Sequence, residues 1–392
     1  PAAGPRHVMM FSIFLIFTGA AVLATVALYA RQSLLMAYIL LGAIVGPAGF
    51  GMVDDPQLIE DIAHVGIIFL LFLLGLDLYP KKLLQLLKEA TVVMIASTLL
   101  FGVLGFGIAA AFGMHRDDCL IVGLATTFSS TIISLKLLPT TVLHHRHTGE
   151  VMISILLLQD LFAITALLIL HGISGDGLGL HRFGLLVLAL PLLLLGGLAG
   201  ERWLLRALFR KFDKIGEYVF LLTLGWCLGL AQLANFLGLS YEMGAFIAGV
   251  TIANSPIAPY IAESLRPLRD FFLIMFFFAL GASLDFSSVG RVWLPALVLA
   301  AAVVIVKPLT YHGLFRSAGE SPALASEAGV RLGQLREFSL LLIMVALQGG
   351  LVSLDAATTV QLATVITFVV SSYAVVMRYP TPIALSDRLR RD

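Results

Sequence analysis

The sequence predicts an all-helical protein that crosses a membrane many times. Of its 392 residues, 59% are hydrophobic and only 12% are charged, and the mean hydropathy is +0.99. A typical soluble domain carries about 25% charged residues and about 45–50% apolar ones. The apolar residues also fall into runs of membrane-spanning length, and the basic residues gather in alternate loops between these runs. Together these observations predict an all-α polytopic membrane protein.

Thirteen apolar runs are long enough, or nearly so, to be membrane-spanning helices. A helix needs about 20 apolar residues to cross the hydrocarbon core. No small-residue cleavage site follows the first run, so we expect it to be kept as a helix and not removed as a signal peptide. The runs lie near residues 8–30, 33–50, 62–78, 90–113, 118–138, 150–173, 183–200, 216–237, 239–254, 268–284, 290–312, 327–347 and 357–377.

The basic residues test this count. If thirteen segments alternate in direction, nineteen of the 25 lysines and arginines lie on one side of the membrane and four on the other. The positive-inside rule then predicts a cytoplasmic C-terminus and an N-terminus outside. The two remaining basic residues, Lys307 and Arg336, fall inside predicted segments. A net charge of +1 argues against a nucleic-acid partner, which would require a basic surface.

Three pairs of stretches indicate an internal repeat. "LLFLLGLDL" forms the end of the third segment, and "FFFALGASLDF" forms the end of the tenth. Their aspartates, Asp77 and Asp285, are 208 residues apart. "MAYILLGAIVGP" resembles "EMGAFIAGVTIANSP", and "ATTFSST" (125–131) corresponds to "GQLREFS" (333–339), at a similar offset. Seven segments separate the copies, an odd number, so the copies run in opposite directions. Inverted repeats with broken helices are typical of secondary transporters, although short apolar motifs also recur by chance.

The stretch "VMISILLLQDLFAITALLIL" (151–170) places an amide and a carboxylate at the centre of an apolar run. A charge near the bilayer midplane costs at least about 2.5 kcal/mol, so such residues usually serve a function. A carboxylate can hold a proton or a hard cation, but not both at once, which is the chemistry that an antiporter requires. We therefore expect Asp160 to bind the ion or proton, and Gln159 to supply a neutral ligand or to be a satisfied polar neighbour.

A lysine lies deep in the eleventh segment. Lys307 is far from either end of its run and is followed by Pro308, which frees a backbone carbonyl. We expect it to be a counter-ion of Asp160; the alternative is a lysine whose long side chain reaches the surface.

Two segments carry polar residues where a continuous apolar helix would be expected. In the fifth, Thr126, Thr127, Ser129 and Ser130 are candidate ion or proton ligands if the helix is unwound there, or they simply bond to carbonyls of their own helix. In the twelfth, the group Gln334, Arg336 and Glu337 is expected to support the broken helix, with Glu337 neutralising Arg336 or the helix end.

Other features indicate no further chemistry. Cys119 and Cys227 both lie in or at apolar runs and predict neither a disulfide framework nor a metal site. "HHRH" (144–147) lies in a cytoplasmic loop, where it is solvated or senses pH. The sequence contains no phosphate-binding loop, no Gly-x-Ser-x-Gly and no metalloprotease helix. We therefore expect neither an enzyme nor a resident cofactor.

These stretches resemble the monovalent cation/proton antiporter superfamily, and most closely its Kef-type potassium/proton branch. Kef-type members have a glutamine before the aspartate of the sixth segment, as Gln159 and Asp160 do here. This chain departs from the branch at Leu335 and Arg336, where small residues are usual. The resemblance rests on "LLFLLGLDL" (70–78), "FSSTIIS" (128–134), "LLLQDLFAI" (156–164), "GAFIAGVTIANS" (244–255), "FFFALGASLDF" (276–286), Lys307 and "GQLREF" (333–338).

The resemblance implies a homodimer in which a core containing two crossed broken helices slides against a fixed panel. It also implies a possible cytoplasmic nucleotide-binding regulatory domain, which is not present in this chain, and a bacterial inner membrane. The implied parts are residues 1–89 (panel helices 1–3), 90–173 (core helices 4–6), 174–215 (linker helix 7), 216–289 (panel helices 8–10), 290–378 (core helices 11–13) and 379–392 (cytoplasmic tail).

The expected activity is electroneutral exchange of a monovalent cation, potassium in the first place, for protons by an elevator mechanism. The alternatives are a sodium/proton antiporter on the same scaffold, a ligand-gated channel-like potassium efflux system, and a membrane sensor that does not transport.

Overall fold

The computed structural model is helical in every described element, and no strand occurs in the described part of the chain. That part comprises residues 5–30, 32, 34–47, 49–53, 65–66, 68–73, 75–76, 80–130, 134, 148, 151–152, 154–156, 158–159, 162–163, 165–166, 180–212, 214–239, 241–253, 255–282, 284 and 286–380. Its helices are α1 (Pro5–Tyr29), α2 (Leu34–Val45), α4 (Pro80–Ala111), α5 (Arg116–Thr127), α9 (Leu180–Gly200), η1 (Glu201–Leu205), α10 (Arg206–Phe212), α11 (Gly216–Phe236), α12 (Tyr241–Ala253), α13 (Ala258–Ser264), α14 (Arg266–Ala282), α15 (Phe286–Ser317), α16 (Pro322–Arg331), α17 (Glu337–Gln348) and α18 (Leu354–Arg378).

The described helices are those of a multi-pass membrane protein. Six are long and apolar enough to cross a bilayer, and three shorter apolar helices accompany them. Many large apolar side chains of these helices are exposed, as expected for surfaces that face lipid. The six spans are Phe11–Tyr29, Thr91–Ala111, Leu188–Phe212, Gly216–Phe236, Ser287–Ser317 and Leu354–Arg378. The all-α prediction is confirmed, and the total of thirteen segments stays a prediction.

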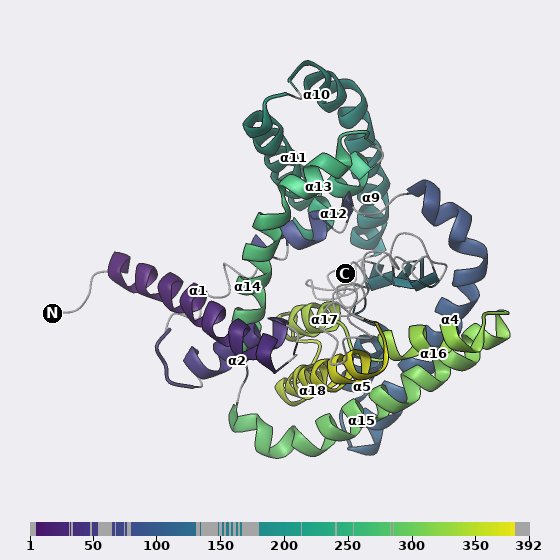
Figure 1. Ribbon diagram of the computed structural model, residues 1–392. Helices are drawn as coiled ribbons and strands as arrows, with labels where there is room; N and C mark the ends of the chain where they lie inside the picture. The colour runs from purple at the N-terminus through teal and green to yellow at the C-terminus, as the bar shows by residue number, and fades with distance from the viewer. Residues whose placement is uncertain are drawn as a thin grey trace.

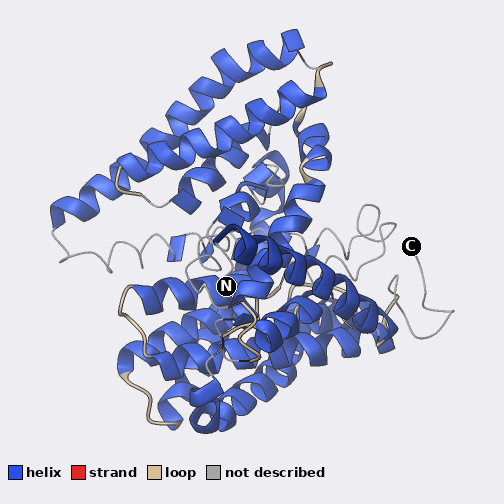
Figure 2. Cartoon of the chain, turned by 90° about the vertical axis from the view of Figure 1, so that its left-hand side faces the viewer, coloured by secondary structure: helices blue, strands red, loops and turns tan. Residues whose placement is uncertain are grey.

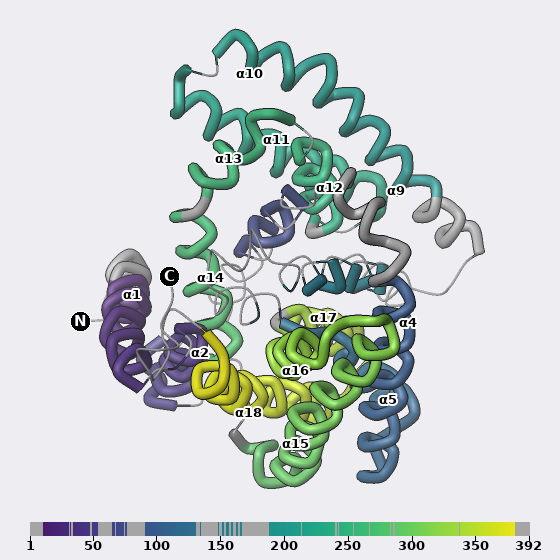
Figure 3. Tube along the Cα trace, turned by 45° about the vertical axis from the view of Figure 1, so that its right-hand side comes forward, coloured from purple at the N-terminus to yellow at the C-terminus, as the bar shows by residue number. Residues whose placement is uncertain are grey.

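The helices gather in two groups (Figures 1, 2 and 3). Helices α9 to α13 lie at one end of the molecule, whereas α4, α5 and α15 to α18 lie at the other. Helix α14 runs between the two groups with α1 and α2 beside it. The division into dimer panel, linker and sliding core stays a prediction.

The two repeats contain equivalent helix crossings, and each crossing depends on glycine. In α2, a Cβ added to Gly42 would overlap the carbonyl oxygen of Phe278 in α14. Seven segments later in the repeat, a Cβ added to Gly249 in α12 would overlap the carbonyl oxygen of Phe72. Each pair of backbones therefore approaches too closely for any residue but glycine.

At each crossing the partner helix also contributes a glycine. Gly281 of α14 lies against the carbonyl oxygen of Ile39 in α2, and Gly75 lies against that of Phe246 in α12. Each helix pair thus contributes one glycine from either side. At each crossing, one helix carries a glycine of the "LLFLLGLDL"/"FFFALGASLDF" pair and the other carries a glycine of the "MAYILLGAIVGP"/"EMGAFIAGVTIANSP" pair.

One basic stretch expected to be a loop is helical. Helix α9 continues through η1 and α10 to Phe212, because no residue after Gly200 stops it. The η1 stretch is a single π-helical turn, which brings residues five apart onto one face. Arg206 uses this spacing to bind the buried carboxylate of Glu201, Nη2 to Oε2, at 2.9 Å. The seventh predicted segment is therefore longer than expected, and α4, which begins at Pro80, also starts earlier than expected.

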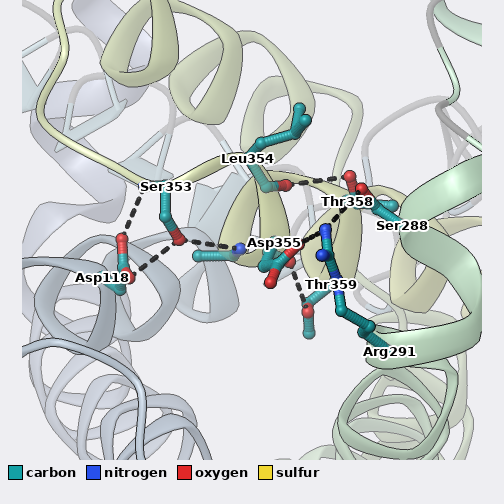
Figure 4. Close-up of polar contacts among 9 residues, drawn as sticks. Asp118, Ser288, Arg291, Ser353, Leu354, Asp355, Thr358 and Thr359 are labelled. Carbon is teal, nitrogen blue, oxygen red and sulfur yellow. Dashed lines mark hydrogen bonds and ion pairs between the residues drawn. The ribbon is translucent and has the colours of Figure 1, made fainter.

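Polar contacts fix the start of α18 to two other helices (Figure 4). The Ser353 hydroxyl caps the helix by accepting from the backbone N–H of Ala356 at 3.2 Å. Asp118 of α5 accepts from both the N–H and the hydroxyl of Ser353, at 2.7 and 2.9 Å. Arg291 of α15 binds Asp355 at 3.0 Å. These contacts hold α5, α15 and α18 together at one end of the core.

The other end of α18 is held by a buried arginine at the end of α16. The Arg331 guanidinium pairs with Glu327 one turn earlier, with Nη2 to Oε1 at 2.9 Å. It also donates to the carbonyl of Pro380 at 2.9 Å and lies over the Tyr379 ring, 5.7 Å from its centroid. The backbone that leaves α18 is therefore attached to the first half of a broken helix.

Candidate functional site

Two helices break inside the core, as predicted. Helix α5 ends at Thr127, residues 128–130 are not helical, and Phe128 is extended with φ −82° and ψ 147°. Helix α16 ends at Arg331, residues 332–336 are not helical, and α17 begins at Glu337. A break leaves backbone N–H and C=O groups without helical partners, so each needs another group to bond to. The prediction of polar interruptions in the fifth and twelfth segments is confirmed.

Lys307 joins the two breaks. It lies in the middle of α15, and none of its side chain is exposed. Its Nζ donates to the carbonyl oxygen of Phe128 at 2.7 Å and to that of Gln334 at 3.4 Å. It also lies over the ring of Phe101 in α4, 4.9 Å from the centroid, in a cation–π contact. Each break thus contributes one carbonyl to the same ammonium.

These contacts decide between the two interpretations of Lys307. A fully buried lysine does not reach the surface, so the alternative of an exposed head group is wrong. Its expected partner, Asp160, lies outside the described residues, and the pairing stays a prediction.

Gln159 lies beside the first break and holds its backbone. Its Oε1 accepts from the N–H of Ser129 at 3.1 Å, and its Nε2 donates to the hydroxyl of Tyr311 at 2.8 Å. The Tyr311 and Ser129 hydroxyls are 3.3 Å apart and complete a ring of three residues. All three side chains are buried. In this arrangement one lone pair of Oε1 is used by the protein itself.

The other hydroxyls of the fifth segment act locally. Thr126 donates to Val122 O at 2.7 Å, and Thr127 donates to Leu124 O at 2.7 Å. For these hydroxyl protons the simpler interpretation, bonding within the helix, is correct. Ser130 is buried, and its carbonyl accepts from Gln334 Nε2 at 3.5 Å. Thr126 and Thr127 thus bond within their own helix, whereas Ser129 and Ser130 bond to other segments.

The second break is tied to the first. Gln334 Nε2 donates to the Ser134 hydroxyl at 3.1 Å, and that hydroxyl is also 2.7 Å from the carbonyl of Arg331. Ser339 at the start of α17 donates to Ala125 O in α5 at 2.6 Å. Among the described residues, Oε1 of Gln334 is buried and has no hydrogen-bond partner, so it is an acceptor that a bound ion could use.

A hydroxyl from α18 supports the second break. The N–H of Leu335 donates to Thr367 Oγ1 at 3.2 Å. Arg336 is buried beside it, with its guanidinium carbon 4.5 Å from the centroid of the Phe338 ring. Glu337 opens α17, but its side chain lies outside the described part, so its predicted neutralisation of Arg336 or of the helix end stays a prediction.

Two supporting residues, Tyr311 and Thr367, were not predicted. Tyr311 follows Lys307 by four residues and so lies on the same face of α15, a spacing that could have drawn attention to it. Thr367 lies 208 residues after Gln159, the offset of the repeat, but an isolated threonine in an apolar helix gives no other signal. The histidines at 144–147 lie outside the described residues.

The described groups of the site are suited to holding a cation. Its described groups are carbonyls, hydroxyls and amides around one ammonium, and carbonyls at helix ends favour positive charge. No group of three or more His, Cys, Asp or Glu side chains that could hold a metal ion occurs in the described part of the chain.

Comparisons with known proteins agree with this architecture. Over its full length, the chain is similar to the sodium proton antiporter MjNhaP1 from Methanocaldococcus jannaschii, solved at pH 8. The TM-score is 0.69 over 98% of each chain, at 17% sequence identity. It is also 28% identical over 347 residues to the iron transporter MagA of Paramagnetospirillum magneticum (strain ATCC 700264 / AMB-1), covering 88% of this chain and 79% of that protein. Residues 13–377 match the family described as "Sodium/hydrogen exchanger, transmembrane", and the chain therefore belongs to this family of cation/proton exchangers.

Proposed function

We propose that the chain exchanges potassium for protons across a bacterial inner membrane, with its C-terminus in the cytoplasm. Membership of the exchanger family supports cation/proton exchange. The pair of Gln159 and Asp160 supports the Kef-type branch, since Gln159 contributes no charge. The observation that carries the proposal is the ammonium of Lys307, bound by a carbonyl from each broken helix in a fully buried site.

The shared carrier is Asp160, which follows Gln159 in the sequence. A carboxylate at this point of an apolar segment would take up either a proton or a potassium ion. Lys307 would serve as the competing cation, and Ser129, Thr126 and Gln159 would line the ion's path. The buried Oε1 of Gln334 adds one acceptor at the crossing. Because Asp160 is the sole carboxylate of the pair, one proton per potassium ion is expected, and exchange would be electroneutral.

We further propose that two copies of the chain form a dimer and that the helices around the two breaks slide against the rest. The crossed breaks support this mechanism, because Lys307 and Gln334 bind them to each other.

An ion series in proteoliposomes tests the proposal. The protein is reconstituted with a pH dye inside, and potassium, sodium or ferrous ion is added outside, with Asp160→Asn in parallel. We expect potassium to move protons in the wild type and not in the variant. A response to sodium alone would make the protein a sodium/proton antiporter. A response to ferrous ion, which the name of the relative MagA makes worth including, would overturn the monovalent assignment.

Potential across the vesicle membrane gives a second readout. Electroneutral exchange should not change when valinomycin and potassium clamp the potential. Currents far above carrier rates would instead indicate a channel-like conductance, and no response to any ion would indicate a gated system or a sensor.

A further inference from the structure

The three-residue ring beside the first break gives each member one defined orientation. Ser129 N–H donates to Gln159 Oε1, so the amide nitrogen of Gln159 must point to Tyr311. Reversing the amide would place N–H against N–H and leave the Tyr311 hydroxyl opposite an oxygen. The N–H of Ser129, which can only donate, therefore fixes which way the buried amide faces, and the Tyr311 hydroxyl accepts from the nitrogen of that amide.

The Tyr311 ring is itself fixed by aromatic packing. Phe101 of α4 meets it edge to face, with centroids 5.2 Å apart, and Phe315 stacks on it at 5.9 Å. The residue is completely buried. Its hydroxyl thus stands at a fixed place relative to α4 and α15 and is a firm support for the groups that bond to it.

Helix α15 contacts consecutive residues of the break through two side chains one turn apart. Lys307 binds the carbonyl of Phe128, and Tyr311 contacts the hydroxyl of Ser129 and, through Gln159, the N–H of Ser129. One contact provides charge. The other provides no charge, and its hydroxyl, which also bonds to Ser97 of α4, connects the break and Gln159 to that helix.

We propose that Tyr311 is a positioning residue for cation binding. Its hydroxyl holds the Gln159 amide, and through it the backbone at Ser129, in the arrangement that sets the affinity for the transported cation. Tyr311 acts through Gln159 and does not touch the ion. This inference rests on the proposed function, and it names a residue that sets affinity at the same site.

The transport test uses Tyr311→Phe, which removes the hydroxyl and keeps the ring. The matched control is Tyr373→Phe, which removes a hydroxyl that donates to Ala30 O at 3.1 Å, away from the breaks. Losing one buried hydrogen bond at the site should raise the cation concentration for half-maximal exchange by roughly tenfold. The maximal rate should stay close to that of the control variant, and the melting temperature should fall by no more than the loss of one buried hydrogen-bond partner predicts. An unchanged half-maximal concentration, a loss of maximal rate alone, or loss of the folded protein in size-exclusion chromatography would each overturn the proposal.

Hydrogen exchange gives a second test that does not depend on transport. The Ser129 amide should exchange faster in Tyr311→Phe than in Tyr373→Phe, because its acceptor is no longer held. Gln159→Leu should speed the same amide, and the double variant Tyr311→Phe/Gln159→Leu should exchange no faster than Gln159→Leu alone.

Failure of the proposed exchange function can be distinguished from failure of the role proposed for Tyr311. If wild-type vesicles show no ion-driven proton movement, the proposed function fails while the exchange of the Ser129 amide still tests the ring. Unchanged amide exchange in Tyr311→Phe, or effects of the two substitutions that simply add, would show that the hydroxyl does not act through Gln159.

Discussion

At the break after α5, the N–H of Ser129 donates to Gln159; at the break after α16, the N–H of Leu335 donates to Thr367. Both acceptors come from the next long segment of their own repeat, and they are 208 residues apart. Each break also gives one carbonyl to Lys307. The repeat therefore supplies the same support twice.

The two supports differ in what accompanies them. Gln159 is followed by Asp160 and is bonded to Tyr311, whereas Thr367 donates only to Thr364 O within its own helix. The difference shows that two repeats with the same backbone support can differ in the side chains around it. Both copies keep the broken helix, and of the two supporting residues only Gln159 is followed by a carboxylate.

The largest expected effect comes from removing that ionisable group. Asp160→Asn should reduce ion-driven proton movement to the level of protein-free vesicles, because an amide cannot take up the exchanged proton. The folded yield should be unchanged. Asp355→Asn, which removes a carboxylate from an exposed ion pair, is the control and should retain activity. Full-rate exchange in Asp160→Asn would remove the chemical difference between the two breaks.

The next effect tests what the breaks share. Lys307→Met keeps the length of the side chain but leaves the carbonyls of Phe128 and Gln334 without their donor. An unpaired buried polar group costs about 1–3 kcal/mol, so the melting temperature of the purified protein should fall clearly. Lys214→Met, at an exposed lysine, should not alter it. Equal melting curves for the two variants would mean that the ammonium does not hold the breaks together.

A third pair of variants asks whether the repeats are equal away from the breaks. Gly42→Ala and Gly249→Ala should destabilise the protein to a similar degree, by about 1–3 kcal/mol, because each new Cβ overlaps a backbone carbonyl across its crossing. Gly196→Ala is the control, since nothing lies within 4 Å of its added Cβ. Thermal unfolding in detergent measures all three. A large difference between the first two would show that one crossing can adjust and the other cannot.

The smallest expected effect tests whether Thr367, the acceptor at the second break, differs in function from Gln159, the acceptor at the first. Thr367→Val removes the acceptor of Leu335 N–H and should lower stability by about 1 kcal/mol without changing the half-maximal cation concentration. Thr364→Val removes a hydroxyl that bonds only to Val360 O in its own helix, and it should cost less. If Thr367→Val shifted cation affinity as much as Tyr311→Phe, the second break would be part of the ion site and the asymmetry would disappear.

Local sequence could predict the breaks because polar residues interrupted apolar runs. The stretches 125–131 and 333–339 predicted both breaks, and Lys307 stood out as a lysine in the middle of an apolar helix. The glycines of the repeated motifs also lie where the backbones cross. In each case a residue type conflicts with its apolar surroundings, and such a conflict is visible without a structure.

The supporting contacts could not be predicted in this way. Thr367 resembles the other threonines of α18, which bond to their own helix, and only the approach of Leu335 distinguishes it. The continuation of α9 to Phe212 was missed because charged residues suggested a loop, although a π-helical turn lets Arg206 neutralise a buried Glu201. These features depend on which helices lie side by side, and the sequence of one segment does not contain that information.

The ammonium between the two carbonyls has a mechanical consequence. Lys307 is bonded at once to the end of α5 and to the chain that follows α16. A helix advances about 1.5 Å per residue, so a shift of one broken helix past the other by two residues, about 3 Å, would lengthen the 2.7 Å bond to about 4 Å or more, beyond hydrogen-bonding distance. For the sliding proposed above, the two broken helices and α15 would therefore have to move together as one rigid unit, and any rearrangement that opens the site would have to occur where this unit meets its neighbours.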